Sequence, residues 1–329
     1  MTRIDRRRFI VMAGTLGAAG AAGAQPAAFP SKPVKLLVGF APGGAVDIIA
    51  RAIGQQIAPG LGQPVVIENK PGAGTNIALR ALIESPPDGH TLMLTANSIA
   101  ANQTLYQPVP FDMARDFTPV ALVGRVPVVL VATLETKAQA PIESIAKLIA
   151  VSKAAPRSVS YGSPGNGSTP HLAIELFERA AGIQLNHVPY KGGAPALNDA
   201  IAGHVQMVAV NALEALPHVR AGKLRVLAVL SPTRSAIFPD APTIAESGFA
   251  GFEATVWYGV VGPAGLPSAV VTRLHAEVQK ALAASEVRDR LANAGGEVLP
   301  GPVERFASLL ASERARYDKL IRDAHIQPD

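Results

Sequence analysis

The chain contains no cysteine among its 329 residues, which excludes a disulfide framework and any metal site built on thiolates. Aromatic residues make up only 5% of it, with a single tryptophan. Stability must therefore come from the packing of aliphatic side chains. The 48% apolar content is spread along the chain, and the length is enough for two domains of roughly 150 residues, each with its own core.

Sequence signatures of cofactor and metal chemistry are also missing. There is no H-E-x-x-H pair, no G-x-S-x-G nucleophile turn and no phosphate-binding G-x-x-x-x-G-K-[ST] loop, and the seven histidines lack zinc-ligand spacing. The run Gly72-Ala73-Gly74 lacks the third glycine of a dinucleotide fingerprint. We predict no cofactor and no metal. No local pattern supports a Ser/His/Asp triad, although counting residues cannot exclude one.

The N-terminus is typical of an export signal. Arg6, Arg7 and Arg8 precede a mildly apolar run that is far shorter than the roughly 20 residues of a membrane span. The small residues that follow supply an expected cleavage site near Ala24. Asp5 to Ile10 resembles the twin-arginine consensus, with an ordinary signal peptide as the alternative. Removing residues 1–24 takes four arginines and one aspartate from 30 basic and 25 acidic residues, which leaves a net charge of +2. Without a basic stripe, nucleic acid is not an expected partner.

Short apolar strands alternate with helical segments along the rest of the chain. The spacing of Ile49, Ile53 and Ile57 predicts one apolar face of a helix over 45–58. Alternation of this kind predicts parallel sheets covered by helices on both faces, and therefore an α/β fold. The long helical part at the C-terminus has no sheet of its own, so we expect it to pack on the first domain. Two chain crossings, near 125–130 and 250–255, would then flank a cleft. Strands are expected at 34–38, 64–68, 91–95, 120–123, 128–132, 158–161, 185–188, 205–210, 224–229 and 253–261, and further helices at 75–84, 142–154, 170–181, 194–202, 267–283 and 302–323.

Three glycine-containing turns lead from the end of a strand into a helix, at 41–44, 163–169 and 190–193. The first N–H groups of a helix lack internal partners and carry partial positive charge, and glycine allows a ligand to approach the backbone closely. Such turns suit a carboxylate or phosphate, although each could simply be a tight connection. In the second turn, Thr169 can cap the helix and Pro170 suits its first turn.

Two charged residues belong to these turns. Asp47 lies in the first helical turn after Gly44, where it can complement the helix dipole or accept a hydrogen bond from a ligand. Lys191 is the one cation within the turns, and it can equally be a solvated loop residue. Anion capture would then depend mainly on backbone N–H groups and hydroxyls.

At these turns the sequence resembles the Bug family of periplasmic solute-binding proteins, the receptors of tripartite tricarboxylate transporters. The likeness runs from about Phe29 to the C-terminus. The matching segments are Phe40-Ala41-Pro42-Gly43-Gly44 with Asp47, Gln63 to Asn69 with Pro71 to Gly74, Pro86 to Gly89, Tyr161 to Leu172, His187 to Gly192, Leu216 to His218 with Ala221 to Leu224, Pro242-Thr243 and Trp257-Tyr258-Gly259.

The resemblance implies a fold of the type II periplasmic binding-protein class, with two α/β domains around a central cleft and two hinge crossings. Its domains would be 30–127 with 254–329, and 128–253. It also implies that the turn backbones of both domains and ordered waters hold a ligand carboxylate. Carried onto this chain, the contacts would be Ala41, Gly43, Gly44, Asp47, Asn97, Ser163, Gly165, Asn166, Gly167, Ser168 and Thr169, with Asn76 and Tyr190 as weaker candidates.

The sequence departs from the family at two positions. Many members have Asp before the residue equivalent to Asn211, where this chain has Val210, which weakens the case for an amino-acid ligand. Many also have Ala where Pro164 stands. The expected partners are a small carboxylate and the membrane subunits of a transporter, with the receptor itself a monomer and not an enzyme. The alternatives are an exported hydrolase or lyase that uses the same cleft, and a sensor that delivers its ligand to a signalling partner.

Overall fold

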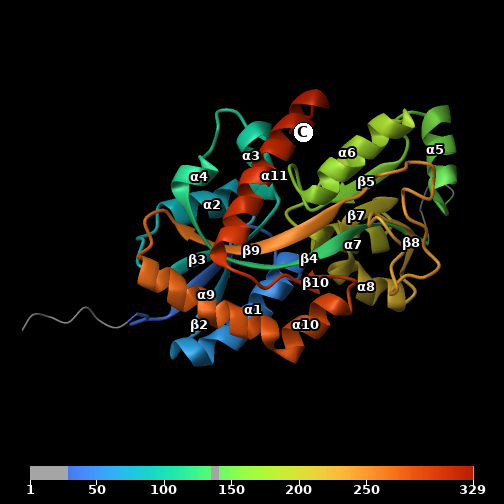
Figure 1. The fold of residues 1–329 in the computed structure, drawn as a ribbon. Helices are drawn as coiled ribbons and strands as arrows, with labels where there is room; N and C mark the ends of the chain where they lie inside the picture. The colour runs from blue at the N-terminus through green and yellow to red at the C-terminus, as the bar shows by residue number, and fades with distance from the viewer. Residues whose placement is uncertain (1–28, 135–140, 329) are drawn as a thin grey trace, which may run out of the picture.

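Ten strands hydrogen-bond into one system that extends across the molecule. The computed structural model describes residues 29–134 and 141–328, so the predicted export signal over 1–24 lies outside the described residues. The strand order is β2-β1-β3-β9-β4-β7-β5-β6, and β8 and β10 each pair with β4. Helices cover the strands in two groups, one at each end of this system (Figure 1).

The first group contains the N-terminal strands. β1 (Val34–Val38) pairs in parallel with β2 (Val65–Asn69) and β3 (Thr91–Ala96), as the alternation of strands and helices predicts. α1 (Ala45–Leu61) buries its isoleucine stripe against these strands, which confirms the helix that the spacing predicts. A 3-10 turn (Ala73–Thr75) and α2 (Asn76–Ile83) follow β2.

Two long strands join the two ends of the molecule (Figure 1). β4 (Phe117–Thr133) is a single strand of 17 residues, so the expectation of two separate strands at 120–123 and 128–132 was wrong. β9 (Thr255–Pro263) runs antiparallel to both β3 and β4, and β4 runs antiparallel to β7 and β8. The sheets are therefore mixed, and the expectation of parallel sheets holds only in part. The antiparallel pairs join residues far apart in the sequence, so local alternation of strands and helices could not predict them.

The pairing of β4 changes along its length. Up to Pro127 its partner is β9, and from Val128 its partners are β7 (Met207–Asn211) and β8 (Leu224–Val229). On the returning chain, the Val128 N–H donates to the Ala254 carbonyl at 3.2 Å, immediately before β9 begins. The chain thus passes between the two ends of the molecule at two adjacent places.

The second group of helices surrounds β5 (Ser160–Ser163), β6 (Asn186–Pro189) and β7. β5 is parallel to both of its neighbours. The helices are α5 (Ile145–Ala154), α6 (Thr169–Ala181), α7 (Gly193–Ile201) and α8 (Ala212–Arg220), of which α8 was not predicted.

The C-terminal helices pack on the first group. α9 (Ser268–Ala283) packs on α1, and α11 (Val303–Asp323) packs on α3 (Ser98–Leu105), while β10 (Glu297–Val298) pairs with β4. The helices α3, α4 (Met113–Asp116) and α10 (Ser285–Ala292) were also not predicted. Across the described ranges, no helix has both the length and the apolar character that a bilayer crossing requires.

Candidate functional site

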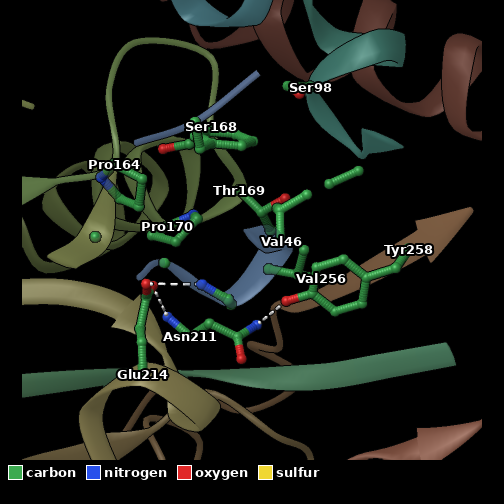
Figure 2. Close-up of a pocket in the computed structure, with 15 residues that line it drawn as sticks. Val46, Ser98, Pro164, Ser168, Thr169, Pro170, Asn211, Glu214, Val256 and Tyr258 are labelled. Atoms are coloured by element: carbon green, nitrogen blue, oxygen red, sulfur yellow. Dashed lines mark hydrogen bonds between the residues drawn. The ribbon is translucent and has the colours of Figure 1, made fainter. Parts of the chain in front are cut away.

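A small cavity of about 40 Å³ lies between the two ends of the molecule, and its lining includes residues from both. This volume holds a few water molecules at most. Residues of β3, α1, α3, α6, α7, α8 and β9 contribute to its wall (Figure 2). The lining residues of this inner cavity are Phe40, Gly44, Ala45, Val46, Ala96, Ser98, Pro164, Ser168, Thr169, Pro170, Gly193, Asn211, Glu214, Val256 and Tyr258.

Five helices begin at the inner cavity. Its lining includes Gly44 before α1, Ser98 at the start of α3, Ser168 before α6, Gly193 at the start of α7 and Asn211 before α8. The aligned peptide dipoles of a helix place a partial positive charge, equivalent to roughly half an elementary charge, at its N-terminus. Five converging N-termini therefore favour negative charge in this cavity.

The two ends of the molecule touch directly beside the cavity. The Ala41 N–H donates to the Lys191 carbonyl at 2.8 Å, and the Ala45 N–H donates to Glu214 Oε2 at 3.0 Å. A second, outer cavity of about 170 Å³ adjoins this contact. Its lining residues are Gly39, Phe40, Gly72, Ala73, Gly74, Thr75, Tyr106, Pro164, Gly165, Asn166, Pro189, Tyr190 and Lys191.

The predicted contact residues divide between the two cavities and their surroundings. Gly44, Ser168 and Thr169 line the inner cavity. Gly165, Asn166 and Tyr190 line the outer one. The others line neither cavity; they are Ala41, Gly43, Asp47, Asn76, Asn97, Ser163 and Gly167. The turns over 41–47 and 163–169 nevertheless face each other across one shared cleft.

Asp47 organises the first turn from within. It is buried, and its carboxylate accepts from the Gly43 N–H at 3.0 Å, from Arg51 at 2.9 Å and from Asn69 Nδ2 at 2.9 Å. Burial alone would raise the pKa of Asp47, but these hydrogen bonds outweigh it and hold that pKa below its ordinary value. The carboxylate thus fixes the backbone that precedes α1.

Two predicted asparagine contacts lie away from the inner cavity. The Asn97 side chain accepts from the Trp257 N–H at 3.0 Å and donates to Glu313 at 3.1 Å, so it ties α3 to β9 and α11. The Asn76 side chain accepts from Asn102 Nδ2 at 2.8 Å, and Gly167 packs against that same asparagine. Both asparagines therefore hold neighbouring elements in place.

A serine and a histidine pair below the second turn. Ser163 Oγ lies 2.7 Å from His187 Nε2 and also accepts from the Gly165 N–H at 3.1 Å. Ser163 is fully buried in β5 and lines neither cavity, so this hydroxyl shapes the turn and is not presented to the cleft as a nucleophile. The His187 ring also stacks on His171, at 4.4 Å between ring centroids, and burial lowers the pKa of His171 to about 3.

The predicted contacts did not include Asn211, Glu214 and Tyr258, polar residues that line the inner cavity where α8 begins. Asn211 Nδ2 donates to the Tyr258 hydroxyl at 2.6 Å, and Glu214 Oε1 accepts from the Asn211 N–H at 3.2 Å (Figure 2). Burial raises the pKa of Glu214 to about 7, against the opposing effect of its two backbone hydrogen bonds. The signal that could have revealed it is the spacing Asn211-x-x-Glu214, which is typical of a capped helix start.

Known proteins resemble this chain in sequence and in fold. Residues 49–326 match the tripartite tricarboxylate transporter family receptor. BugT of Bordetella pertussis is 35% identical over 90% of each chain. An R. palustris protein solved with adipate is 36% identical with a TM-score of 0.85, over 92% of this chain and 100% of that one. MatC from Rhodopseudomonas palustris, solved with bound malate, is 31% identical with a TM-score of 0.83, over 89% and 100%. Over the residues that the structure describes, no group of three or more acidic or histidine side chains is placed to hold a metal ion.

Proposed function

Because the chain belongs to the tripartite tricarboxylate transporter receptor family, whose members are periplasmic solute-binding proteins, we propose that it captures a small carboxylate in the cleft between its two ends and presents it to a transporter. The main support for a negatively charged ligand is that five helices begin at the inner cavity, where their N-termini favour an anion. The similar proteins solved with adipate and malate also hold carboxylates.

The affinity is within reach of these groups. Micromolar binding needs about 8 kcal/mol, and a hydrogen bond to a charged group contributes about 1.5–3 kcal/mol. Four or five such bonds suffice after ordering costs. The predicted contacts remain our proposal for the ligand site, with Gly44, Ser168 and Thr169 nearest to the bound carboxylate.

We assign the two lobes to 30–127 with 254–329, and to 128–253. A four-carbon diacid is larger than the 40 Å³ inner cavity, so the lobes must separate for it to enter. The direct contact between Ala41 and Lys191 would break in the open form, and bending where β4 and β9 pass between the lobes would allow it. We further propose that residues 1–24 form the export signal, that cleavage occurs near Ala24, that the receptor is a monomer, and that it binds its ligand without catalysing a reaction.

A binding titration that compares charged diacids with uncharged diamides of the same size tests the proposal. We expect at least one diacid among succinate, malate and adipate to bind with micromolar affinity in isothermal titration calorimetry, with a decrease in the radius of gyration by X-ray scattering. The matched diamides keep the size and lose the charge, and they should not bind. If diacid and diamide bind equally, or if no acid binds, the proposal fails. Recovery of a chemically altered acid after incubation would favour the hydrolase or lyase instead.

A further inference from the structure

Glu214 places a carboxylate inside the cleft, where a negatively charged ligand is expected. The residue lies in the first turn of α8 and is only 6% exposed. Its two oxygens accept from the N–H groups of Asn211 and Ala45, at 3.2 and 3.0 Å. Figure 2 shows the side chain pointing from α8 toward the side of the cavity where Pro164 and Pro170 lie.

The surrounding chain leaves room for this group. A Cβ atom at Gly193 would lie 2.2–2.4 Å from the Glu214 carboxylate, so residue 193 can be only a glycine while Glu214 keeps this position. An acidic residue in a first helical turn can cap its helix from the surface at no desolvation cost. Capping of α8 alone therefore does not account for a carboxylate that is buried in the cavity wall and also accepts from Ala45 at the start of α1.

Other polar side chains of the wall already have partners within the protein. The Asn211 amide donates to Tyr258, and the Ser168 hydroxyl accepts from the His171 N–H at 3.4 Å. Glu214 is the one carboxylate among the fifteen residues that line the inner cavity. A carboxylate has about four acceptor positions, and the backbone N–H groups take two of them. The rest can only be satisfied by a hydrogen-bond donor.

Resting on the proposed function, we propose that Glu214 selects the ligand: it accepts a hydrogen bond from a hydroxyl or ammonium group that the ligand carries beside its carboxylate. The helix N-termini would hold the carboxylate, and Glu214 would hold the donor on the adjacent carbon. Val210, which stands where many relatives have Asp, weakened the case for an amino-acid ligand. The structure supplies a carboxylate from one turn further along the chain.

Succinate, malate and aspartate test this inference, because they share a four-carbon diacid and differ in one substituent. Affinities are measured by calorimetry at pH 8 for the wild type, Glu214→Gln and the control Glu304→Gln. Glu304 is an exposed acid in the first turn of α11 and lines neither cavity. We expect the wild type and the control to prefer malate or aspartate over succinate by about tenfold or more. In Glu214→Gln this preference should fall to less than threefold, while succinate binds as well as before or better. Preference for malate alone identifies a hydroxyl as the donor, and preference for aspartate identifies an ammonium.

Two results would overturn the inference. One is a wild type that binds succinate as tightly as malate and aspartate. The other is a Glu214→Gln variant that weakens all three acids by the same factor, since that indicates a purely structural role. If the wild type binds none of these three acids, and binds neither adipate nor 2-hydroxyadipate, the proposed function itself fails. The wild-type preference needs no variant, so it remains informative even if Glu214→Gln does not fold.

Discussion

The pH dependence of folding is the sharpest consequence of the buried Glu214 carboxyl. Burial raises its pKa from an ordinary 4.5 to about 7. Each pH unit of such a shift corresponds to about 1.36 kcal/mol, so the total is about 3 kcal/mol for a fully buried group. Since the folded protein holds this proton more tightly than the unfolded chain, the contribution is fully present below pH 4.5. It is lost as the pH rises through about 7.

The perturbation is Glu214→Gln, which cannot ionise. Glutamine offers one oxygen to the two N–H groups of Asn211 and Ala45, so one of them loses its acceptor at a fixed cost of about 1–3 kcal/mol. This offset does not depend on pH. We therefore expect the free energy of unfolding of the variant, relative to the wild type, to rise by about 2–3 kcal/mol between pH 5 and pH 8.

The assay is urea unfolding followed by circular dichroism at pH 5, 6, 7 and 8. Glu178, whose pKa burial also raises to about 7, titrates in the same window but is unchanged in both proteins, so its effect cancels in the difference. Burial, with the nearby Glu214 charge, raises the pKa of Tyr258 well above this range. Glu304→Gln, at an exposed position in the first turn of α11, is the matched control. A flat difference for Glu214→Gln across the four pH values would refute the reasoning, because it would mean that the carboxyl titrates as an exposed group.

Three further predictions address the turn, the closure and the core. Asp47→Ala should lower the free energy of unfolding by about 2–3 kcal/mol. The hydrogen bonds from the Gly43 N–H and from Asn69 contribute about 1 kcal/mol each, and the ion pair with Arg51 contributes less than about 1 kcal/mol because Arg51 is exposed to solvent. Because the pKa of Asp47 is lowered in the folded protein, the full loss of stability should be seen above about pH 4 and should become smaller as the pH falls below that value. Urea unfolding at several pH values measures it, and a loss that does not change with pH would contradict the hydrogen bonds assigned to the Asp47 carboxylate. Ala194→Trp should hold the lobes apart, because Ala194 lies so near Gly43 that a Cβ added at Gly43 would be only 3.6 Å from Ala194 Cβ. We expect at least tenfold weaker acid binding and a larger scattering radius at unchanged stability, and unaltered scattering would argue against closure. Phe306→Ala should cost about 3–5 kcal/mol in urea unfolding, because this fully buried ring packs on Trp257 and over Gly259; a loss below 1 kcal/mol would refute that packing.

Local order along the chain could be predicted from the sequence, because it depends on neighbouring residues. The strand over 34–38, the isoleucine stripe of α1 and the glycine turns before α1, α6 and α7 follow from side-chain periodicity and backbone freedom within a few positions. The ordered matches to the receptor family added the class of fold and ligand, and the comparisons confirm the family.

Longer-range pairing could not be predicted in this way. Two strands were expected at 120–123 and 128–132, but β9 pairs along β4 from Phe117 to Pro127 and keeps it continuous. The antiparallel insertion of β9 between β3 and β4 also pairs residues at least 128 positions apart in the chain, from Pro127 with Thr255 up to Met93 with Val261. Such pairing is decided by which surfaces meet in the folded protein.

The site divides in the same way. The sequence by itself identified the turns that lie at the cleft, because glycine content and the starts of helices are local properties. Only the tertiary structure decided which groups face the cavity: it turned Asn97 toward Trp257, closed Asp47 into a network with Arg51, and brought Glu214 to the Ala45 N–H across 169 positions of the chain. A hydrogen bond between distant residues depends on how the two lobes meet, and that meeting leaves no pattern in either segment alone.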